Sequence, residues 1–226
     1  MASEPGEGAA QPPGALKVGF LRAIEPTETT RVETLSDGVF AVAMTLLILD
    51  VKLPPMSQGI SAAQYSALVF GLWPKLAIFV CSFVVLTQVW IIHRYLFHLL
   101  KTCDQVLLLW NFLVLIFVTC LPLSTSLAGE YPHFSLSAAI YAGNLLAMHL
   151  AYRGLWHHAS HRDYLMKGDL DPVIPKSVRQ RFNVYFLLVT AALVVSYFSS
   201  FVSIGLIMAY EFLMFFGQPL FRGRAV

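Results

Sequence analysis

The apolar positions of this chain gather into long runs and do not alternate with polar positions. A helix needs about 20 mostly apolar residues to cross the hydrocarbon core of a membrane, and several runs approach or exceed that length. They predict six helices, at about Val32–Leu53, Pro74–Leu99, Asp104–Leu127, Phe134–His157, Phe182–Ser199 and Phe201–Leu220. The last two are short and joined by a tight turn, which predicts a helical hairpin. A further stretch, Ile60–Leu72, is mildly amphipathic and is typical of a segment in the outer membrane interface.

Composition favours an all-α polytopic membrane protein and argues against several other classes. The chain is 57% hydrophobic and only 12% charged, whereas soluble domains carry about 25% charge. A net charge of +2 is too small to indicate nucleic-acid binding. The three cysteines, Cys81, Cys103 and Cys120, show neither a disulfide framework nor metal-ligand spacing. No nucleophile elbow, zinc-protease motif or phosphate loop is present, so we expect no enzyme, no metal and no cofactor.

The basic residues predict the orientation of the helices. With the N-terminus in the cytoplasm, all of the 15 Lys and Arg residues except Lys52 and Lys75 fall on the cytoplasmic side. The positive-inside rule therefore places both termini inside, which requires an even number of spans. We expect a disordered tail over residues 1–28, a six-helix channel domain over 29–221 and a short basic tail over 222–226. A polar loop is expected from Ala159 to Gln180.

The first apolar run carries an apolar stripe with one hydroxyl in it. At about 100° per residue, its members fall within about 40° of one line; they are Leu35, Gly38, Val42, Thr45, Leu46, Leu49 and Leu53. One interpretation is a surface that packs against another helix or faces lipid. The other is a pore lining, which requires a symmetric oligomer with this helix at its axis. Rings of Val42, Leu46 and Leu49 would then form a constriction that closes by dewetting, with Thr45 supplying hydroxyls.

Ser36 and Asp37 lie on other faces of the same helix, where buried polar groups need partners. The topology sets them level with Trp90, His93, His98, Asp104, Trp110 and Asn111, and we predict bonds to some of these groups. The two histidines could instead be ordinary interfacial residues near a helix end. Gly38 has no side chain and is expected to let a neighbouring helix approach closely.

Two other places carry polar groups that are candidates for a functional role. Asp50 would concentrate cations at the outer mouth of a tetramer, or else pair with Lys52. His157, His158 and His161 form a cluster that is either a titratable cap or, as a second interpretation, a metal site.

Two acidic or basic groups lie inside later runs. Glu211 is the only acid in the sixth run, and Tyr197 or the Ser199–Ser200 turn are its candidate partners. His149 is interpreted as a packing histidine whose hydrogen bonds are satisfied.

Several ordered motifs resemble the single-repeat prokaryotic relatives of the lysosomal potassium channel, the transmembrane protein 175 family. Its signature, Arg-x-x-x-Phe-Ser-Asp-Gly, is similar to Arg31–Gly38, with Leu35 in place of the phenylalanine. Trp90-Ile-Ile-His93 resembles its Trp-x-x-His-His, with Arg94 in place of the second histidine. Leu109–Phe112 and Leu121–Thr125 resemble its Trp-Leu-Asn and Pro-Phe-Ser-Thr patterns.

The resemblance implies a homotetramer in which four copies of the first helix surround a pore for monovalent cations, with a preference for K⁺. It implies that the pore rings are Val42, Thr45, Leu46 and Leu49, and that large apolar side chains form the constriction. Arg31, Ser36, Asp37 and Gly38, together with His93, His98, Asp104, Trp110 and Asn111, would hold the pore helix. A single-repeat chain also implies the plasma membrane of a prokaryote.

Three functions therefore remain open at this point. The first is a potassium-permeable channel with a hydrophobic constriction on the first helix. The second is a proton-coupled carrier that uses Asp37 and nearby histidines, although the paired repeats common in carriers are not visible. The third is a membrane scaffold that transports nothing.

Overall fold

The structure of the chain is a computed structural model that describes residues 28–52, 60–168 and 173–217. Within these ranges the chain is helical apart from connections and one isolated bridge between Leu100 and Met166. In chain order the elements are α2 (Thr29–Leu46), the 3₁₀ helix η1 (Leu47–Asp50), α3 (Ala62–Gly71), α4 (Trp73–His98), α5 (Gln105–Glu130), α6 (Ser135–Ser160), α7 (Val173–Ser196) and α8 (Ser200–Gly217).

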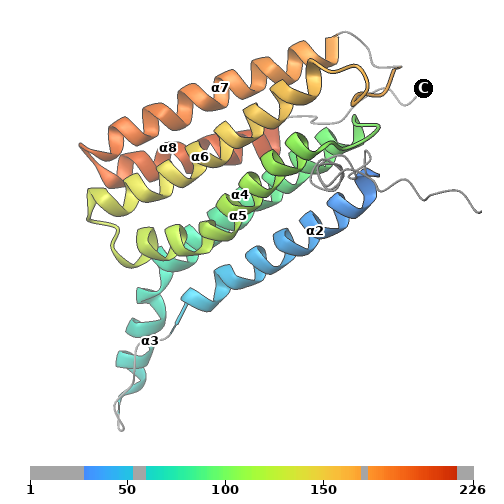
Figure 1. Ribbon diagram of the computed structural model, residues 1–226. Coiled ribbons are helices and arrows are strands. Elements are labelled where there is room, and N and C mark those ends of the chain that lie inside the picture. The colour runs from blue at the N-terminus through green and yellow to red at the C-terminus, as the bar shows by residue number, and fades with distance from the viewer. Residues whose placement is uncertain (1–27, 53–59, 169–172, 218–226) are drawn as a thin grey trace, which may run out of the picture.

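Six long helices lie side by side, and the short α3 extends away from them (Figure 1). Helix α5 packs against α2, α4 and α6, and α7 packs against α6 and α8. Helix α2 therefore lies at one side of the bundle and α7 at the other (Figure 1). Each predicted apolar run corresponds to one of the long helices, and α5 continues through Pro122.

Four stretches among the described residues are long and apolar enough to cross a membrane: Thr29–Leu49, Ala62–His98, Gln105–Glu130 and Val173–Ser196. Helix α6 is as long as α4 and α5, but it carries polar residues such as Asn144, His149 and Arg153. Helix α8 contributes a shorter apolar stretch, Ser200–Met214. Length and composition thus support a membrane protein with several spans.

The predicted loop over Ala159–Gln180 is wrong in its second half, because α7 begins at Val173. Val178 and Phe182 are four residues apart and both buried, while Lys176 and Arg179 are exposed. The charged residues suggested a loop, but they occupy the outer face of a helix whose apolar positions recur at helical spacing. The expected tails, residues 1–28 and 222–226, lie outside the described residues except for Glu28.

The amphipathic stretch Ile60–Leu72 forms α3. Its start is fixed by a capping box, in which the Ser61 hydroxyl accepts from the Gln64 backbone N–H and the Gln64 side chain accepts from the Ser61 N–H. No residue of α3 is buried, and Phe70 is 80% exposed. The helix therefore offers its apolar side chains to surroundings outside the bundle.

Polar side chains inside the bundle bond to one another across helices. The hydroxyl of Thr125 donates to Ser82 Oγ at 2.9 Å, and Ser82 Oγ lies 3.2 Å from the Tyr141 hydroxyl. These three residues come from α5, α4 and α6. Because each hydroxyl has a partner, the bundle buries them without the full cost of an unpaired polar group.

Trp110 of α5 lies against Gly154 of α6. A Cβ atom built at Gly154 would lie 2.5 Å from two carbons of the Trp110 ring and 2.6 Å from a third. Such distances are below any van der Waals contact, so any larger residue would displace the indole. The absence of a side chain at Gly154 is therefore what allows α5 and α6 to pack here.

We expect Gly154→Ala to lower the melting temperature of the purified protein. Overpacking of this kind costs about 1–3 kcal/mol, which exceeds the helix propensity that alanine gains over glycine. Gly143→Ala on the same helix is a matched control, because a Cβ there meets nothing within 4 Å. Equal melting temperatures for the two variants would contradict this account of the α5–α6 contact.

Candidate functional site: the first helix and its polar network

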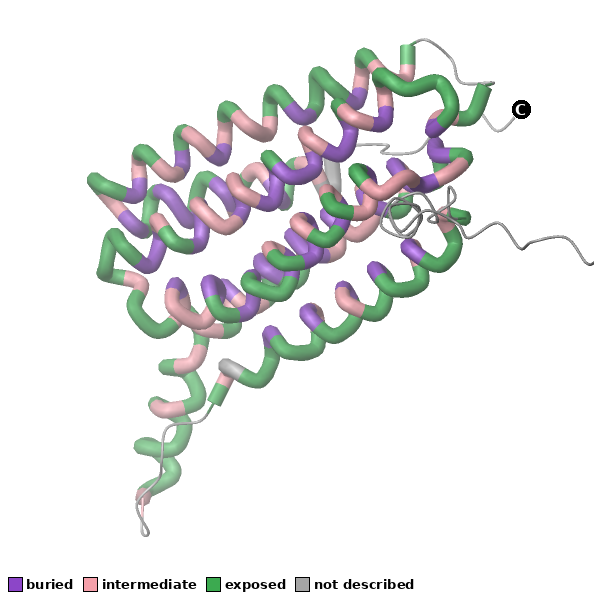
Figure 2. The backbone as a smooth tube through the Cα atoms, in the orientation of Figure 1, coloured by how far each residue is buried: buried purple, intermediate pink, exposed green. Residues whose placement is uncertain are grey.

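Helix α2 has a buried face toward the bundle and an uncovered apolar face. Figure 2 shows buried and exposed positions alternating along it with the helical repeat. The uncovered face includes Val42 at 56%, Leu46 at 41% and Leu49 at 59% exposure, with Thr45 also exposed. These are the predicted stripe residues. A single chain therefore leaves the described part of the stripe open to lipid or to another copy, while Leu53 lies outside the described residues.

The Thr45 hydroxyl on this stripe donates to the backbone carbonyl of Val42 at 2.8 Å. Its hydrogen is thus engaged within the helix, while the oxygen retains free lone pairs on the exposed side. An oxygen with available lone pairs is the kind of group that replaces part of the hydration shell of a cation. The stripe consequently combines apolar side chains with one hydrogen-bond acceptor, the hydroxyl oxygen of Thr45.

The buried face of α2 meets a polar network between α2, α4 and α5. Ser36, His93 and Asn111 are almost completely buried. The Asn111 amide donates to Ser36 Oγ at 3.2 Å, and its Oδ1 lies 2.9 Å from His93 Nε2. Because an amide oxygen only accepts, Nε2 of His93 carries the proton. Ser36 in turn donates to the backbone carbonyl of Val32 at 2.8 Å.

Aromatic side chains enclose His93 on both sides. The imidazole stacks on Phe97 with 4.4 Å between ring centroids, and Phe40 of α2 meets its edge at 5.5 Å. A ring held by stacking and by a hydrogen bond has little freedom to rotate. His93 is therefore a rigid link between α2 and α5, and it is not an interfacial histidine.

Asp37 makes a second link, which joins the exposed side of α2 to α4. The Trp90 indole N–H donates to Asp37 Oδ1 at 2.7 Å. The Arg94 guanidinium lies 5.8 Å from the centroid of the Trp90 ring, which adds a cation–π contact. Arg94, which replaces the second histidine of the motif, thus contacts the tryptophan that binds Asp37.

The structure does not bring every predicted network residue together. Trp110 points to Gly154 of α6, and His98 is exposed at the end of α4. Arg31 is exposed in the first turn of α2. The sequence places these residues at the right depth, but depth does not determine the direction in which a side chain points. Trp110 and Asn111 are neighbours in sequence and lie about 100° apart around α5.

Gly38 differs from its expected role within one chain. A Cβ atom at this position would meet nothing within 4 Å, so none of the other described helices approaches it closely. Gly38 lies on the uncovered face of α2, which remains open to another molecule.

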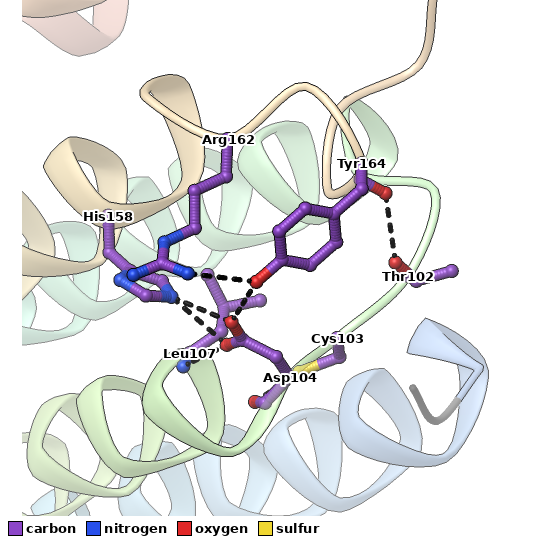
Figure 3. Close-up of polar contacts among 7 residues, drawn as sticks. All are labelled: Thr102, Cys103, Asp104, Leu107, His158, Arg162 and Tyr164. Carbon is purple, nitrogen blue, oxygen red and sulfur yellow. Dashed lines mark hydrogen bonds and ion pairs between the residues drawn. The ribbon is translucent and has the colours of Figure 1, made fainter. Parts of the chain in front are cut away.

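Asp104 belongs to a separate cluster at the end of the bundle where α4 joins α5 (Figure 3). Its Oδ1 accepts from the Leu107 backbone N–H at 2.8 Å, which caps α5. Its Oδ2 accepts from the Tyr164 hydroxyl at 2.8 Å and lies 2.9 Å from His158 Nε2. The prediction that Asp104 joins the Ser36–Asp37 network is therefore wrong, because its partners come from α6 and the connection that follows it.

Backbone hydrogen bonds hold the connection between α4 and α5 beside the segment that follows α6. The Lys101 N–H donates to the Leu165 carbonyl at 2.8 Å, and the Lys167 N–H donates to the Leu99 carbonyl at 3.1 Å. Arg162 donates to the Tyr164 hydroxyl at 3.1 Å (Figure 3). Sequence reasoning missed Tyr164 and Arg162. The cap at Asp104 was detectable from an aspartate before an apolar run, but its long-range partners had no local signal.

The pKa of Asp104 is lower than its ordinary value of 3.8. Burial alone would raise this pKa, because it disfavours the charged form. The hydrogen bonds from the Leu107 N–H, His158 and Tyr164, together with the charge of His158, act in the opposite direction and prevail. The cluster therefore stabilises a carboxylate at neutral pH.

Acid is expected to weaken this cluster in a defined pH range. Because the pKa of Asp104 is lower in the folded state, its stabilising contribution is complete above the ordinary pKa and is lost as pH falls through the folded value. Asp104→Asn keeps a capping side chain but has no charge. We expect its melting temperature to lie below wild type at neutral pH and the difference to shrink below about pH 4. A difference that stays constant down to about pH 3 would contradict the assignment.

The other histidines follow the predictions only in part. The rings of His157 and His161 share a face, with 4.3 Å between centroids, and the His161 Nδ1 lies 2.8 Å from the His157 carbonyl. His158 leaves this pair and meets Asp104. No group of three or more His, Cys, Asp or Glu side chains suited to a metal occurs within residues 28–52, 60–168 and 173–217.

Glu211 and His149 are both buried and bonded. Glu211 accepts from the Tyr185 hydroxyl at 2.8 Å, so the expected partners Tyr197 and the Ser199–Ser200 turn are wrong. Those residues lie at or before the start of α8, and Ser200 is about 17 Å from Glu211 along the helix axis by the rise per residue. His149 Nε2 lies 2.7 Å from the Phe182 carbonyl, which confirms a satisfied packing histidine. Asp50 ends η1, and its side chain lies outside the description.

Comparison with known proteins places this geometry among membrane channels. Residues 31–122, which span α2, η1, α3, α4 and most of α5, match the family described as endosomal/lysosomal potassium channel TMEM175. A potassium channel of Chamaesiphon minutus is 36% identical over 191 residues, which cover 82% of this chain and 93% of that protein. A potassium channel of Streptomyces collinus is 35% identical over 159 residues, covering 69% and 76% of the two chains.

Solved structures and more distant relatives extend the comparison. The crystal structure of a lysosomal potassium-selective channel TMEM175 homolog from Chamaesiphon minutus superposes with a TM-score of 0.71 at 29% identity. It covers 81% of this chain and 94% of that chain. The endosomal/lysosomal proton channel TMEM175 of Gallus gallus is 33% identical over 112 residues, which cover 47% of this chain and 22% of that protein.

Proposed function

We propose a function from an established premise: this chain belongs to the family of the endosomal/lysosomal potassium channel TMEM175. It is a multi-pass membrane channel protein and not an enzyme. We propose that it passes K⁺, with leakage of other monovalent cations, across the plasma membrane. Both similar bacterial proteins reported above are named potassium channels, which supports K⁺ as the permeant ion.

The conducting unit that we propose is a homotetramer with α2 at its axis. The observation that carries this proposal is the uncovered stripe on α2, a helix that Ser36 anchors to α5 and Asp37 anchors to α4. A lone helix with one anchored face and one open apolar face is suited to meet its own copies. Four copies of Val42, Leu46 and Leu49 would line a constriction that excludes water until it widens. Thr45 would add a ring of hydroxyl oxygens, and Asp50 a ring of carboxylates at the outer mouth.

The rest of the bundle would hold α2 at that axis. We propose both termini in the cytoplasm, because the basic residues then lie almost entirely on that side. In this orientation the Ser36–Asn111–His93 bonds and the Asp37–Trp90 bond lie near the cytoplasmic end of the pore helix. They would transmit any displacement of α4 or α5 to the constriction.

K⁺ efflux from liposomes tests this function. Full-length protein is reconstituted into K⁺-loaded vesicles that are diluted into low-K⁺ buffer with an external pH-sensitive dye. A potassium channel gives a dye response only after a protonophore is added to balance the charge. Native mass spectrometry of the same sample should give four times the chain mass of 25.1 kDa. Vesicles no leakier than protein-free ones, from a confirmed tetramer, would contradict the proposal.

Proton transport is the second candidate, because vertebrate relatives such as the Gallus gallus protein are named proton channels. A dye response before the protonophore is added would favour it, because protons would then cross through the protein itself, either alongside K⁺ or in exchange for it. The described contacts offer Asp37 no direct hydrogen bond to a histidine, since its carboxylate accepts from Trp90.

A further inference from the structure

A cavity of about 300 Å³ lies between α4, α6, α7 and α8, in a part of the bundle that α2 does not reach. Its lining comes from all four helices, and no lining residue belongs to α2. The volume is at the lower end of the range for small-molecule sites, which are mostly apolar with a few converging polar groups. The cavity is therefore independent of the stripe from which we infer the ion pathway.

One acidic side chain faces this cavity from α8. Glu211 is only 3% exposed, and its Oε1 accepts from the Tyr185 hydroxyl at 2.8 Å. Its backbone carbonyl accepts from the Gln88 amide at 2.7 Å, which fixes α8 against α4. Neither of the two ion pairs among the described residues involves Glu211. A carboxyl group buried in an apolar segment without a cationic partner is costly to ionise, and such groups often mark binding sites.

Aromatic rings form much of the remaining wall. Tyr95, Tyr152, Phe182, Tyr185 and Tyr210 all line the cavity. The rings of Tyr185 and Tyr210 contact each other, with 5.5 Å between centroids, and the Tyr185 hydroxyl donates to Glu211. Aromatic faces carry negative potential and attract organic cations, most strongly where water is excluded. A carboxyl group among such rings is the combination that recognises an ammonium group attached to an apolar body.

Two basic groups also line the cavity and need to be accounted for. Arg181 is exposed on α7, one helical turn before the Tyr185 that donates to Glu211. His149 uses Nε2 on the Phe182 carbonyl, and its ring stacks obliquely near Tyr185 at 4.9 Å. Glu211 is thus the buried acidic group of the lining, and Arg181 is an exposed basic residue of it.

We propose that this cavity binds a small lipophilic organic ammonium ion. Its ammonium group would contact Glu211 and the Tyr185 and Tyr210 rings, and its apolar body would fill the space toward Ile92 and Met148. The bound cation would supply the charge partner that Glu211 lacks. This site goes beyond the proposed function, because it is separate from the ion pathway and its occupancy is measured without ion flux.

Calorimetric titration of the full-length protein in detergent at neutral pH tests the proposal with two matched probes. Phenethylammonium carries the charge, and 2-phenylethanol has the same aromatic body and a neutral hydroxyl. Wild type is expected to bind the ammonium about tenfold or more tightly than the alcohol, because a hydrogen bond to a charged group is worth more than a neutral one. Equal affinities, or no binding of either probe, would overturn the proposal without any variant.

Two substitutions then locate the site. Glu211→Gln is expected to abolish the preference for the ammonium, while Glu130→Gln, an exposed acid at the end of α5, should preserve it. Ile92→Trp keeps Glu211 but fills the cavity, and it is expected to abolish binding of both probes. If the ammonium preference survives in Glu211→Gln or binding survives in Ile92→Trp, the probe occupies another site, such as the ion pathway, and the assignment is wrong.

Discussion

Replacement of Leu46 by asparagine is expected to raise K⁺ flux per reconstituted tetramer by about tenfold, because a polar ring hydrates a constriction that otherwise expels water. Leu46 is 41% exposed on the uncovered face of α2, so its replacement disturbs little of the packing within one chain. The measurement is the initial rate of dye response in K⁺-loaded liposomes at matched protein content.

A leucine on another exposed surface serves as the control for this experiment. Leu187 lies on α7 at 68% exposure, far from α2, and Leu187→Asn makes the same chemical change there. Its flux should equal that of wild type. If neither variant changes flux, or if both raise it equally, then α2 does not form the constriction and the apolar stripe faces lipid.

Asn111→Leu is expected to have the largest effect on stability. It removes the amide that joins α2 to α4, leaving the His93 N–H without its acceptor and Ser36 without its donor. An unsatisfied buried polar group costs about 1–3 kcal/mol, so the melting temperature should fall by several degrees or more. The yield of assembled protein in detergent should fall with it, since α2 loses its anchor.

Two further variants separate this network from a general effect of asparagine loss. Asn183→Leu removes an exposed asparagine whose side-chain oxygen accepts from Arg153 at 2.6 Å, and it should change the melting temperature little. Adding His93→Leu to Asn111→Leu removes the orphaned N–H as well. Replacing both partners by apolar groups is often nearly neutral, so the double variant should recover part of the stability. A further loss of stability in the double variant would contradict the network as drawn.

The polar groups around α2 show how far local patterns reach. Ser36 and Asp37 lie in an apolar run, so the need for partners from other helices follows from the cost of burying them. Trp90, His93 and Asn111 were correctly among the candidates because topology sets them at the same depth. Trp110, His98 and Asp104 satisfied the same condition and point elsewhere, since depth says nothing about rotation around the helix axis.

The sequence by itself determined the long apolar helices, the stripe on the first of them and the polar groups that interrupt it. These features repeat with the geometry of a single helix, in which each residue turns by about 100°, so they need no knowledge of neighbours. Only the tertiary structure decided that Asp104 meets His158 and Tyr164, that Trp110 lies on Gly154 and that Glu211 meets Tyr185. Each of these pairs is more than 25 residues apart in sequence, and each depends on which helices adjoin and how they are rotated. That choice follows from the packing of whole helix faces, which no local period encodes.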